Sequence, residues 1–175
     1  MTFISKIYSL NMEPKPNTKK ILILDRDNTI NRDTGYTYRL KDLVLIEESV
    51  ELLASAAELR IPVVIISNQS LVNRGLASLD EVEKFNDALV EKLEKKKCKI
   101  DAIIFCPHIP EEECSCRKPK IDMFLEAFRY YPEASEFCYV GDSESDMEAA
   151  KNAGIEFFSS SIKYGYTQAI NWLTK

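Results

Sequence analysis

The feature that most constrains the fold is a regular alternation of short apolar runs with longer helical segments. The apolar runs have the length of buried strands, and the segments between them carry helix signals. This alternation predicts an α/β fold: a three-layer, Rossmann-like parallel sheet with helices on both faces. The predicted strands are 21–25, 61–66, 101–105, 137–140 and 155–158, and the predicted helices are 49–59, 79–96, 121–130, 144–153 and 166–174.

The length of 175 residues is typical of one domain with a full core. We expect residues 21–175 to form this domain. Residues 1–20 are predicted to be a weakly ordered leader, because Pro14 and Pro16 interrupt them. A signal peptide is not expected, since Lys6 breaks the first apolar stretch and no small-residue cleavage site follows.

Composition limits the partners. The net charge is −5, so no overall basic field favours nucleic acid, and no apolar stretch approaches the ~20 residues of a membrane span. The lysine-rich stretch 92–99 is interpreted as the solvated end of a helix, with phosphate binding as the alternative. We expect a cytoplasmic protein that acts on a small molecule, without nucleic acid or membrane partners, and that works as a monomer.

Two acids follow the first predicted strand, in the motif Asp25-Arg26-Asp27. Alternation along an extended chain would place Asp25 and Asp27 on one side and Arg26 on the other. Two such carboxylates can divide the chemistry, one as nucleophile and one as proton donor and acceptor. The alternative is a solvated acidic turn at the end of a strand.

Gly141-Asp142 follows another predicted strand, and ligands bind at the carboxyl ends of strands in open α/β sheets. If the two strands are neighbours, Asp25, Asp27 and Asp142 converge, and their repulsion requires a hard divalent cation. The sequence predicts Mg²⁺ held by Asp25, Asp142 and a main-chain carbonyl near Asp27. The alternative for Asp142 is that it caps the amino terminus of the following helix. Asp146, in the first turn of that helix, could orient the metal ligands or compensate the helix dipole.

Soft metal ligands crowd into residues 106–116. Three thiols and the chain's single imidazole, which are Cys106, His108, Cys114 and Cys116, can complete the closed tetrahedron of a structural zinc site. A disulfide or free thiols are the alternative. With this histidine bound to zinc, no imidazole remains for a Ser-His-Asp triad, and Asp27 is left as the proton carrier.

With these elements in order, the chain resembles the haloacid-dehalogenase superfamily of aspartyl-phosphate phosphatases. The matching motifs, spread over residues 21–146, include 25–36, 67–70 with Arg74-Gly75, Lys118 and Gly141-Asp142. The first loop is similar to the branch that hydrolyses D-glycero-D-manno-heptose 1,7-bisphosphate. The short metal loop is closer to the sister branch, the histidinol-phosphate phosphatases. We give the first loop more weight because it should face the substrate.

The resemblance implies a role for each matching residue. Asp25 would attack phosphorus to form an aspartyl-phosphate, and Asp27 would protonate the leaving sugar oxygen and then activate water. Lys118, together with Arg117, would neutralise charge at the phosphoryl group. Ser67 and Asn68 would donate hydrogen bonds to the phosphoryl oxygens or position the substrate.

Two positions depart from the family pattern. Asn28 stands where the superfamily most often has Gly, and Ser143 stands where the heptose enzymes usually carry Lys. Asn tolerates the backbone angles that glycine supplies. The serine removes one cation from the predicted site.

The motif spacing leaves no room for a cap domain, so we expect an open site roofed by loops 30–45, 69–77 and 106–117. Specificity would then depend on Asp33, Tyr36, Arg74 and Arg117, each of which could instead be an ordinary surface residue. Two competing functions remain. A DNA 3′-phosphatase shares the Asp-x-Asp opening but lacks support from the acidic composition, and a non-catalytic scaffold would not need the acids that are present.

Overall fold

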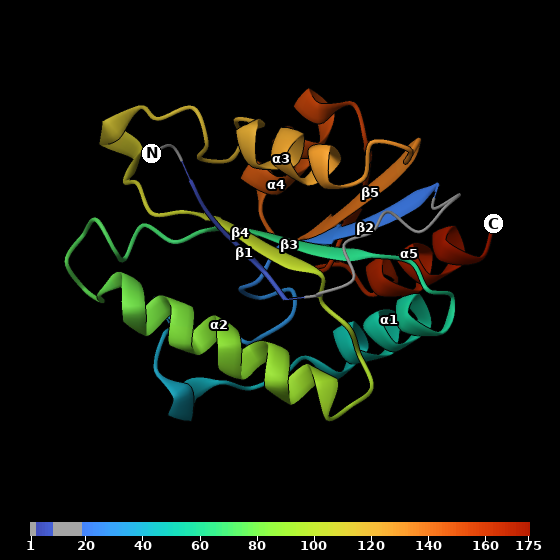
Figure 1. Cartoon of the computed structure of the whole chain (residues 1–175), viewed down its shortest axis with the longest axis horizontal. Coiled ribbons are helices and arrows are strands. Elements are labelled where there is room, and N and C mark those ends of the chain that lie inside the picture. The colour runs from blue at the N-terminus through green and yellow to red at the C-terminus, as the bar shows by residue number, and fades with distance from the viewer. Residues whose placement is uncertain (1–2, 9–18) are drawn as a thin grey trace.

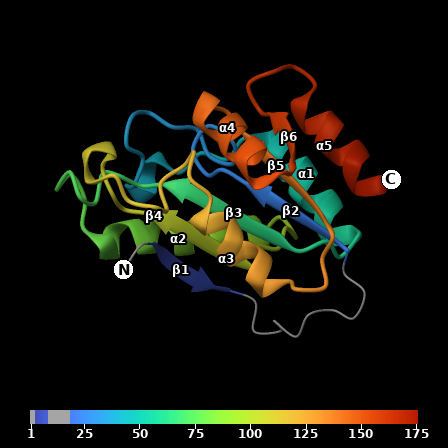
Figure 2. The same cartoon turned by 90° about the horizontal axis from the view of Figure 1, so that it is seen from above.

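The structure is a computed structural model, and it describes residues 3–8 and 19–175. Six strands form one sheet in the order β1-β4-β3-β2-β5-β6. Every neighbouring pair is parallel except β1 and β4, which are antiparallel. The mostly parallel sheet and its two helical layers, visible in Figures 1 and 2, confirm the predicted fold class.

The strands are β1 (Ile4–Ile7), β2 (Lys20–Leu24), β3 (Val63–Asn68), β4 (Ala102–Cys106), β5 (Glu136–Gly141) and β6 (Glu156–Ser159). β2 lies between β3 and β5, with Leu24 opposite Ile65 on one side and Val140 on the other. The carboxyl ends of these three strands therefore meet at one edge of the sheet. This arrangement confirms the predicted neighbourhood of the strands that precede Asp25 and Asp142.

The helices are α1 (Glu47–Glu58), α2 (Leu79–Glu94), α3 (Asp122–Tyr130), α4 (Glu144–Ala153) and α5 (Gly165–Thr174), with short 3-10 turns at Leu40–Asp42 and Pro110–Glu112. α3 and α4 cover one face of the sheet, and α1, α2 and α5 cover the other (Figure 1). Each face encloses its own apolar cluster. Alternate residues of β2 divide between these clusters, which explains why the strand is apolar throughout.

All predicted strands and helices are present, with shifts of one or two residues at most ends. Ser78 and Glu81 form a capping box at the start of α2. Gly154, at φ 70°, ends α4.

The amino-terminal segment differs from the weakly ordered leader that we expected. β1 extends the sheet by pairing with β4, and the Lys6 ammonium lies 2.6 Å from the Asp87 carboxylate. The rest of the expected leader, residues 1–2 and 9–18, lies outside the described residues. Among the described helices, none has the length and apolar character needed to cross a membrane.

Candidate active site

A polar cavity of about 370 Å³ lies at the carboxyl ends of the three central strands. Most of the residues proposed from the sequence line it. They are Asp25, Asp27, Asp33, Tyr36, Ser67, Asn68, Arg117, Lys118 and Asp142, joined by Asn28, Gln69, Ser143 and Asp146 among others. The topology thus gathers side chains that lie far apart in the sequence, as parallel strands do at a shared edge.

Three carboxylates form a cluster in this cavity. One oxygen from each of Asp25, Asp142 and Asp146 lies within 4.8 Å of the others, a donor set suited to a hard cation. Burial, opposed by Lys118 and reinforced by Asp146, raises the pKa of Asp25 to about 7. Burial likewise raises the pKa of Asp142 above its ordinary value. The excess of negative charge and the all-oxygen ligand set fit Mg²⁺.

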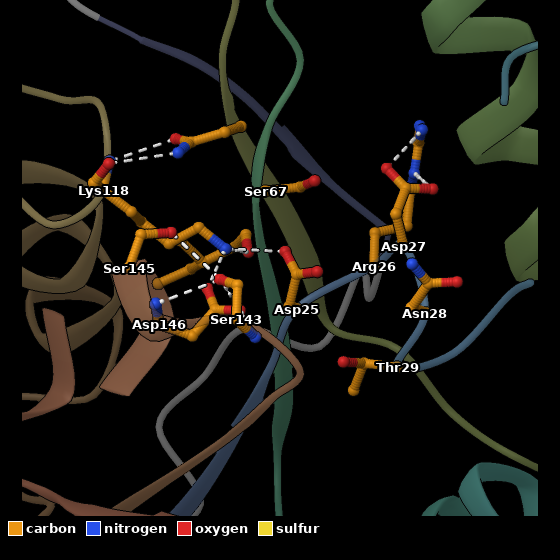
Figure 3. A network of polar contacts seen from close by, with 12 residues as sticks. Asp25, Arg26, Asp27, Asn28, Thr29, Ser67, Lys118, Ser143, Ser145 and Asp146 are labelled. Atoms are coloured by element: carbon orange, nitrogen blue, oxygen red, sulfur yellow. Dashed lines mark hydrogen bonds and ion pairs between the residues drawn. The ribbon is translucent and has the colours of Figure 1, made fainter. Parts of the chain in front are cut away.

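Lys118 is the buried cation of the site. Its ammonium lies 2.6 Å from Asp25 Oδ1 and 2.6 Å from Asp146 Oδ1 (Figure 3). It also donates to the Tyr139 hydroxyl at 2.7 Å. The lysine side chain is only 3% exposed, so solvent screens these ion pairs little. Lys118 can therefore stabilise negative charge on the Asp25 carboxylate and on a group attached to it.

Asp146 has a larger role in the site than either sequence alternative gave it. It is 1% exposed and belongs to the acid cluster, whereas we expected a dipole-compensating or orienting residue at this position. Ser143 caps α4 and donates from its hydroxyl to Asp146 Oδ2 at 2.6 Å. A Cβ on Gly141 would lie 2.6 Å from Asp146 Cβ, so only glycine permits this close approach.

Asp25 and Asp27 line the same cavity, as strand alternation predicted, but Asp27 is not separated from Arg26. β2 ends at Leu24, and the following turn brings the Asp27 carboxylate against the Arg26 guanidinium, with nitrogen–oxygen distances of 2.9 and 3.1 Å. The prediction that Arg26 points away from Asp27 is therefore wrong, because the period-two pattern applies only within a strand. The Asp27 carboxylate lies beside Arg26 rather than within the cluster of acids (Figure 3).

Ser67 and Asn68 are the last residues of β3 and line the cavity. The Asn68 amide is engaged with the backbone of Lys118: Nδ2 donates to its carbonyl at 3.2 Å, and Oδ1 accepts from its N–H at 3.0 Å. The Ser67 hydroxyl accepts from Gln69 Nε2 at 2.7 Å and keeps its own proton available for a ligand. Asn68 thus positions Lys118, and Ser67 is the better candidate for contact with a ligand.

Three of the four residues proposed for specificity line the cavity, and Arg74 does not. Asp33 and Tyr36 line the cavity, and Asp33 Oδ1 organises its loop by accepting hydrogen bonds from Gly35 and Thr37. Tyr36 is 48% exposed and presents an aromatic face.

Arg117 also lines the cavity, with Nη1 donating to the His108 carbonyl at 3.2 Å. Arg74 is exposed and is not among the lining residues. Asn28 occupies the left-handed region at φ 53°, the conformation that glycine would otherwise supply, and its Oδ1 accepts from the Asp33 N–H at 3.0 Å.

The four predicted zinc ligands also come together. The Sγ atoms of Cys106, Cys114 and Cys116 lie 3.1–3.6 Å apart, and His108 Nδ1 is 3.4 Å from two of them. A tetrahedral site with Zn–S bonds of ~2.3 Å has sulfur–sulfur edges of about 3.8 Å, close to these values. Burial raises the pKa of the Cys106 thiol to about 11, an effect that a bound cation would offset. The donor set therefore fits zinc.

Four residues of the site escaped sequence reasoning. Arg26, Asn31 and Gln69 contact Asp27. Tyr139 joins Lys118 to Asp146 by donating from its hydroxyl to Asp146 Oδ1 at 2.7 Å. Gln69 sits in the polar motif that follows the second predicted strand, a signal that could have identified it. Tyr139 has no such signal, because a buried aromatic in a strand is usually core.

The fold and the site together define a Rossmann-like hydrolase with an acidic centre compensated by a buried lysine. A family model described as haloacid dehalogenase-like hydrolase matches residues 14–154, and the chain belongs to this family. The resemblance of the sequence motifs is thereby confirmed.

The chain is similar to several phosphatases. It is 37% identical to a probable D-glycero-D-manno-heptose-1,7-bisphosphate 7-phosphatase of Thermoplasma acidophilum, over 80% of this chain and 89% of the relative. It is 41% identical to the D-glycero-beta-D-manno-heptose-1,7-bisphosphate 7-phosphatase of Helicobacter pylori, over 80% and 82%.

Two solved structures resemble the fold. The D,D-heptose 1,7-bisphosphate phosphatase of B. bronchiseptica, complexed with magnesium and phosphate, has a TM-score of 0.75 and 29% identity, over 86% of each chain. A putative had-like phosphatase of Mesorhizobium loti has a TM-score of 0.85 over 98% of this chain and 93% of that chain, and at 23% identity it supports the fold alone.

Proposed function

We propose that this protein is a Mg²⁺-dependent phosphatase that removes the 7-phosphate of D-glycero-D-manno-heptose 1,7-bisphosphate through an aspartyl-phosphate on Asp25. The observation that carries the chemistry is the buried Asp25 carboxylate at the end of β2, paired with Lys118 and clustered with two further acids. The names of the curated relatives support the choice of substrate.

Each residue has a defined part in this chemistry. An Asp25 oxygen attacks phosphorus in line, and Asp27 gives a proton to the leaving sugar oxygen as the P–O bond breaks. Asp27 then takes a proton from the water that hydrolyses the aspartyl-phosphate. Lys118 compensates the charge of the transferred group, and Ser67 can donate to one of its oxygens.

Mg²⁺ would be held by Asp25, Asp142 and a main-chain carbonyl near Asp27, with the Asp146 carboxylate clustered beside them, and it would neutralise phosphoryl charge there. We further propose a structural zinc on the four clustered Cys and His side chains. Its place immediately before Arg117 and Lys118 would stiffen the loop that delivers both cations. Such a thiolate site favours a reducing compartment, and we propose a cytoplasmic monomer without nucleic acid or membrane partners.

The proposal is tested by phosphate release with Mg²⁺ from both anomers of heptose 1,7-bisphosphate, from histidinol phosphate and from a 3′-phosphorylated DNA oligonucleotide. We expect the highest kcat/KM on a heptose anomer and no turnover by Asp25→Asn, which lacks the nucleophile. Higher kcat/KM on histidinol phosphate or DNA would reassign the substrate. Equal activity of Asp25→Asn would refute the mechanism, and a folded wild type inactive on every ester would favour the scaffold.

A further inference from the structure

Four donor contacts from three neighbouring side chains hold the Asp27 carboxylate. Arg26 donates from Nε and Nη2 at 3.1 and 2.9 Å, Asn31 Nδ2 donates at 2.9 Å, and Gln69 Nε2 donates at 2.7 Å. A carboxylate has about four acceptor positions, so these contacts fix both oxygens of the ionised group, and one of them must open when Asp27 carries the proton that it donates. The position of Asp27 is thus set by its neighbours rather than by its own rotamer alone.

Gln69 is the member of this set that reaches the ligand-binding side chains. Its Nε2 donates to both Asp27 Oδ2 and Ser67 Oγ, each at 2.7 Å, while its Oε1 accepts from Arg26 Nη2 at 2.8 Å. Arg26 can only donate, so it fixes which end of the amide faces Asp27. Gln69 is 2% exposed, and no competing water can replace these bonds without opening the site.

Arg26 forms a rigid base for this arrangement. It is 1% exposed, its guanidinium lies 4.7 Å from the centre of the Phe85 ring, and it donates to Asn86 Oδ1 at 3.0 Å and to the Thr37 carbonyl at 2.9 Å. These partners belong to α2 and to the loop after β2. The position of the Gln69 amide is therefore tied to elements outside the strands that carry the catalytic residues.

We propose that Gln69 is a positioning residue for proton transfer, setting the Asp27 carboxyl in line with the leaving oxygen and coupling it to Ser67. This inference rests on the proposed function, in which Asp27 gives its proton to the sugar oxygen while the P–O bond pair moves onto that oxygen. Gln69 itself exchanges no proton. Its contribution is confined to esters whose leaving oxygen needs a proton.

The test compares two esters with one enzyme. A sugar hydroxyl is a poor leaving group and requires the acid, whereas nitrophenolate leaves from p-nitrophenyl phosphate without protonation. General acid catalysis contributes about 10²–10⁴-fold, so we expect Gln69→Leu to lower kcat/KM on heptose 1,7-bisphosphate at least ~30-fold. The same variant should lower kcat/KM on p-nitrophenyl phosphate by less than ~3-fold. The parameter kcat/KM isolates the first phosphoryl transfer from the later hydrolysis.

Three further variants make the test decisive. Gln168→Leu repeats the substitution on an exposed glutamine outside the site and should match the wild type on both esters. Asp27→Asn sets the largest selective loss that the acid can produce. Gln69→Glu keeps an acceptor for Arg26 but removes the donor to Asp27, and it should reproduce the selective loss if Gln69→Leu fails to fold.

Equal losses on the two esters, or full activity of both Gln69 variants on the heptose ester, would overturn the role of Gln69. A wild type that hydrolyses neither ester would instead overturn the proposed function. The two failures are therefore distinguishable.

Discussion

Replacing Lys118 by methionine is expected to destabilise the Mg²⁺-free protein by about 3–5 kcal/mol, the usual cost of leaving a buried charge without its partner. The Lys118 ammonium lies 2.6 Å from both Asp25 and Asp146, and the three side chains are 3%, 9% and 1% exposed. At an effective dielectric near 20, a unit-charge pair at this distance attracts by about 6 kcal/mol, and desolvation offsets part of that attraction. The expected loss is a large fraction of the ~5–15 kcal/mol that stabilises a typical domain.

The destabilisation by Lys118→Met should also depend on pH. Burial already raises the pKa of Asp25 to about 7, and the lysine opposes that rise. Without the lysine, the folded-state pKa moves further above the unfolded value of ~3.9. A carboxyl with a raised folded-state pKa loses stability as the pH increases, because the unfolded state then holds fewer protons. The deficit should therefore be smaller at pH 5 than at pH 8, although the loss of the Lys118–Asp146 pair remains at both because Lys118 lowers the pKa of Asp146.

The assay is urea unfolding followed by circular dichroism, in buffer prepared without magnesium rather than with a chelator that would also strip a thiolate-bound metal. Lys84→Met is the matched control, because the Lys84–Asp80 pair has the same 2.6 Å separation but is 67% and 70% exposed. Exposed pairs contribute little, so this variant should unfold like the wild type. Equal losses in Lys118→Met and Lys84→Met, or a pH-independent deficit, would refute the reasoning.

Three further predictions concern the metals and their support. Mg²⁺ at 100 times its Kd at pH 8 stabilises by about 2.7 kcal/mol. Because the pKa of Asp25 is raised to about 7, protons compete with Mg²⁺ at pH 5.5 and should reduce this stabilisation to about 1 kcal/mol. A Mg²⁺-induced Tm shift that calorimetry finds to be larger at pH 5.5 than at pH 8 would contradict the prediction. Elemental analysis should find one zinc ion per chain. Cys116→Ser should lose the zinc and have a lower Tm, whereas Cys98→Ala should keep the zinc. Zinc retained by Cys116→Ser would exclude the proposed site. Gly141→Ala should weaken Mg²⁺ binding by displacing Asp146, and an unchanged Kd by titration calorimetry would show that the close approach is not required.

The zinc ligands could be predicted from the sequence because they lie within eleven positions. Cys106 ends β4, and the short loop returns Cys114 and Cys116 to it, so local chain geometry determines most of the site. The alternation of elements was equally informative, since each strand and each helix carries its own periodicity. Both predictions depend on interactions that are close in sequence.

The acid cluster was harder to predict because its members come from different elements. Asp25 follows β2, while Asp142 and Asp146 follow β5, and only the pairing of β2 with β5 brings them together. Sequence motifs identified Asp25 and Asp142 as candidate ligands. Asp146 remained ambiguous, because an acid in the first turn of α4 has a sufficient explanation in helix capping, and the structure gives it both roles.

The orientation of Asp27 illustrates what strand periodicity cannot supply. The alternating pattern ends with β2 at Leu24, and beyond it the carboxylate follows its hydrogen-bond donors rather than a regular backbone. Those donors are Arg26, Asn31 and Gln69, and all three lie in segments that connect the strands and helices. A proton donor must be fixed relative to the leaving group within fractions of an ångström. The residues that determine catalytic precision here are consequently those whose role depends on contacts between distant segments, and such residues become recognisable only when the fold is known.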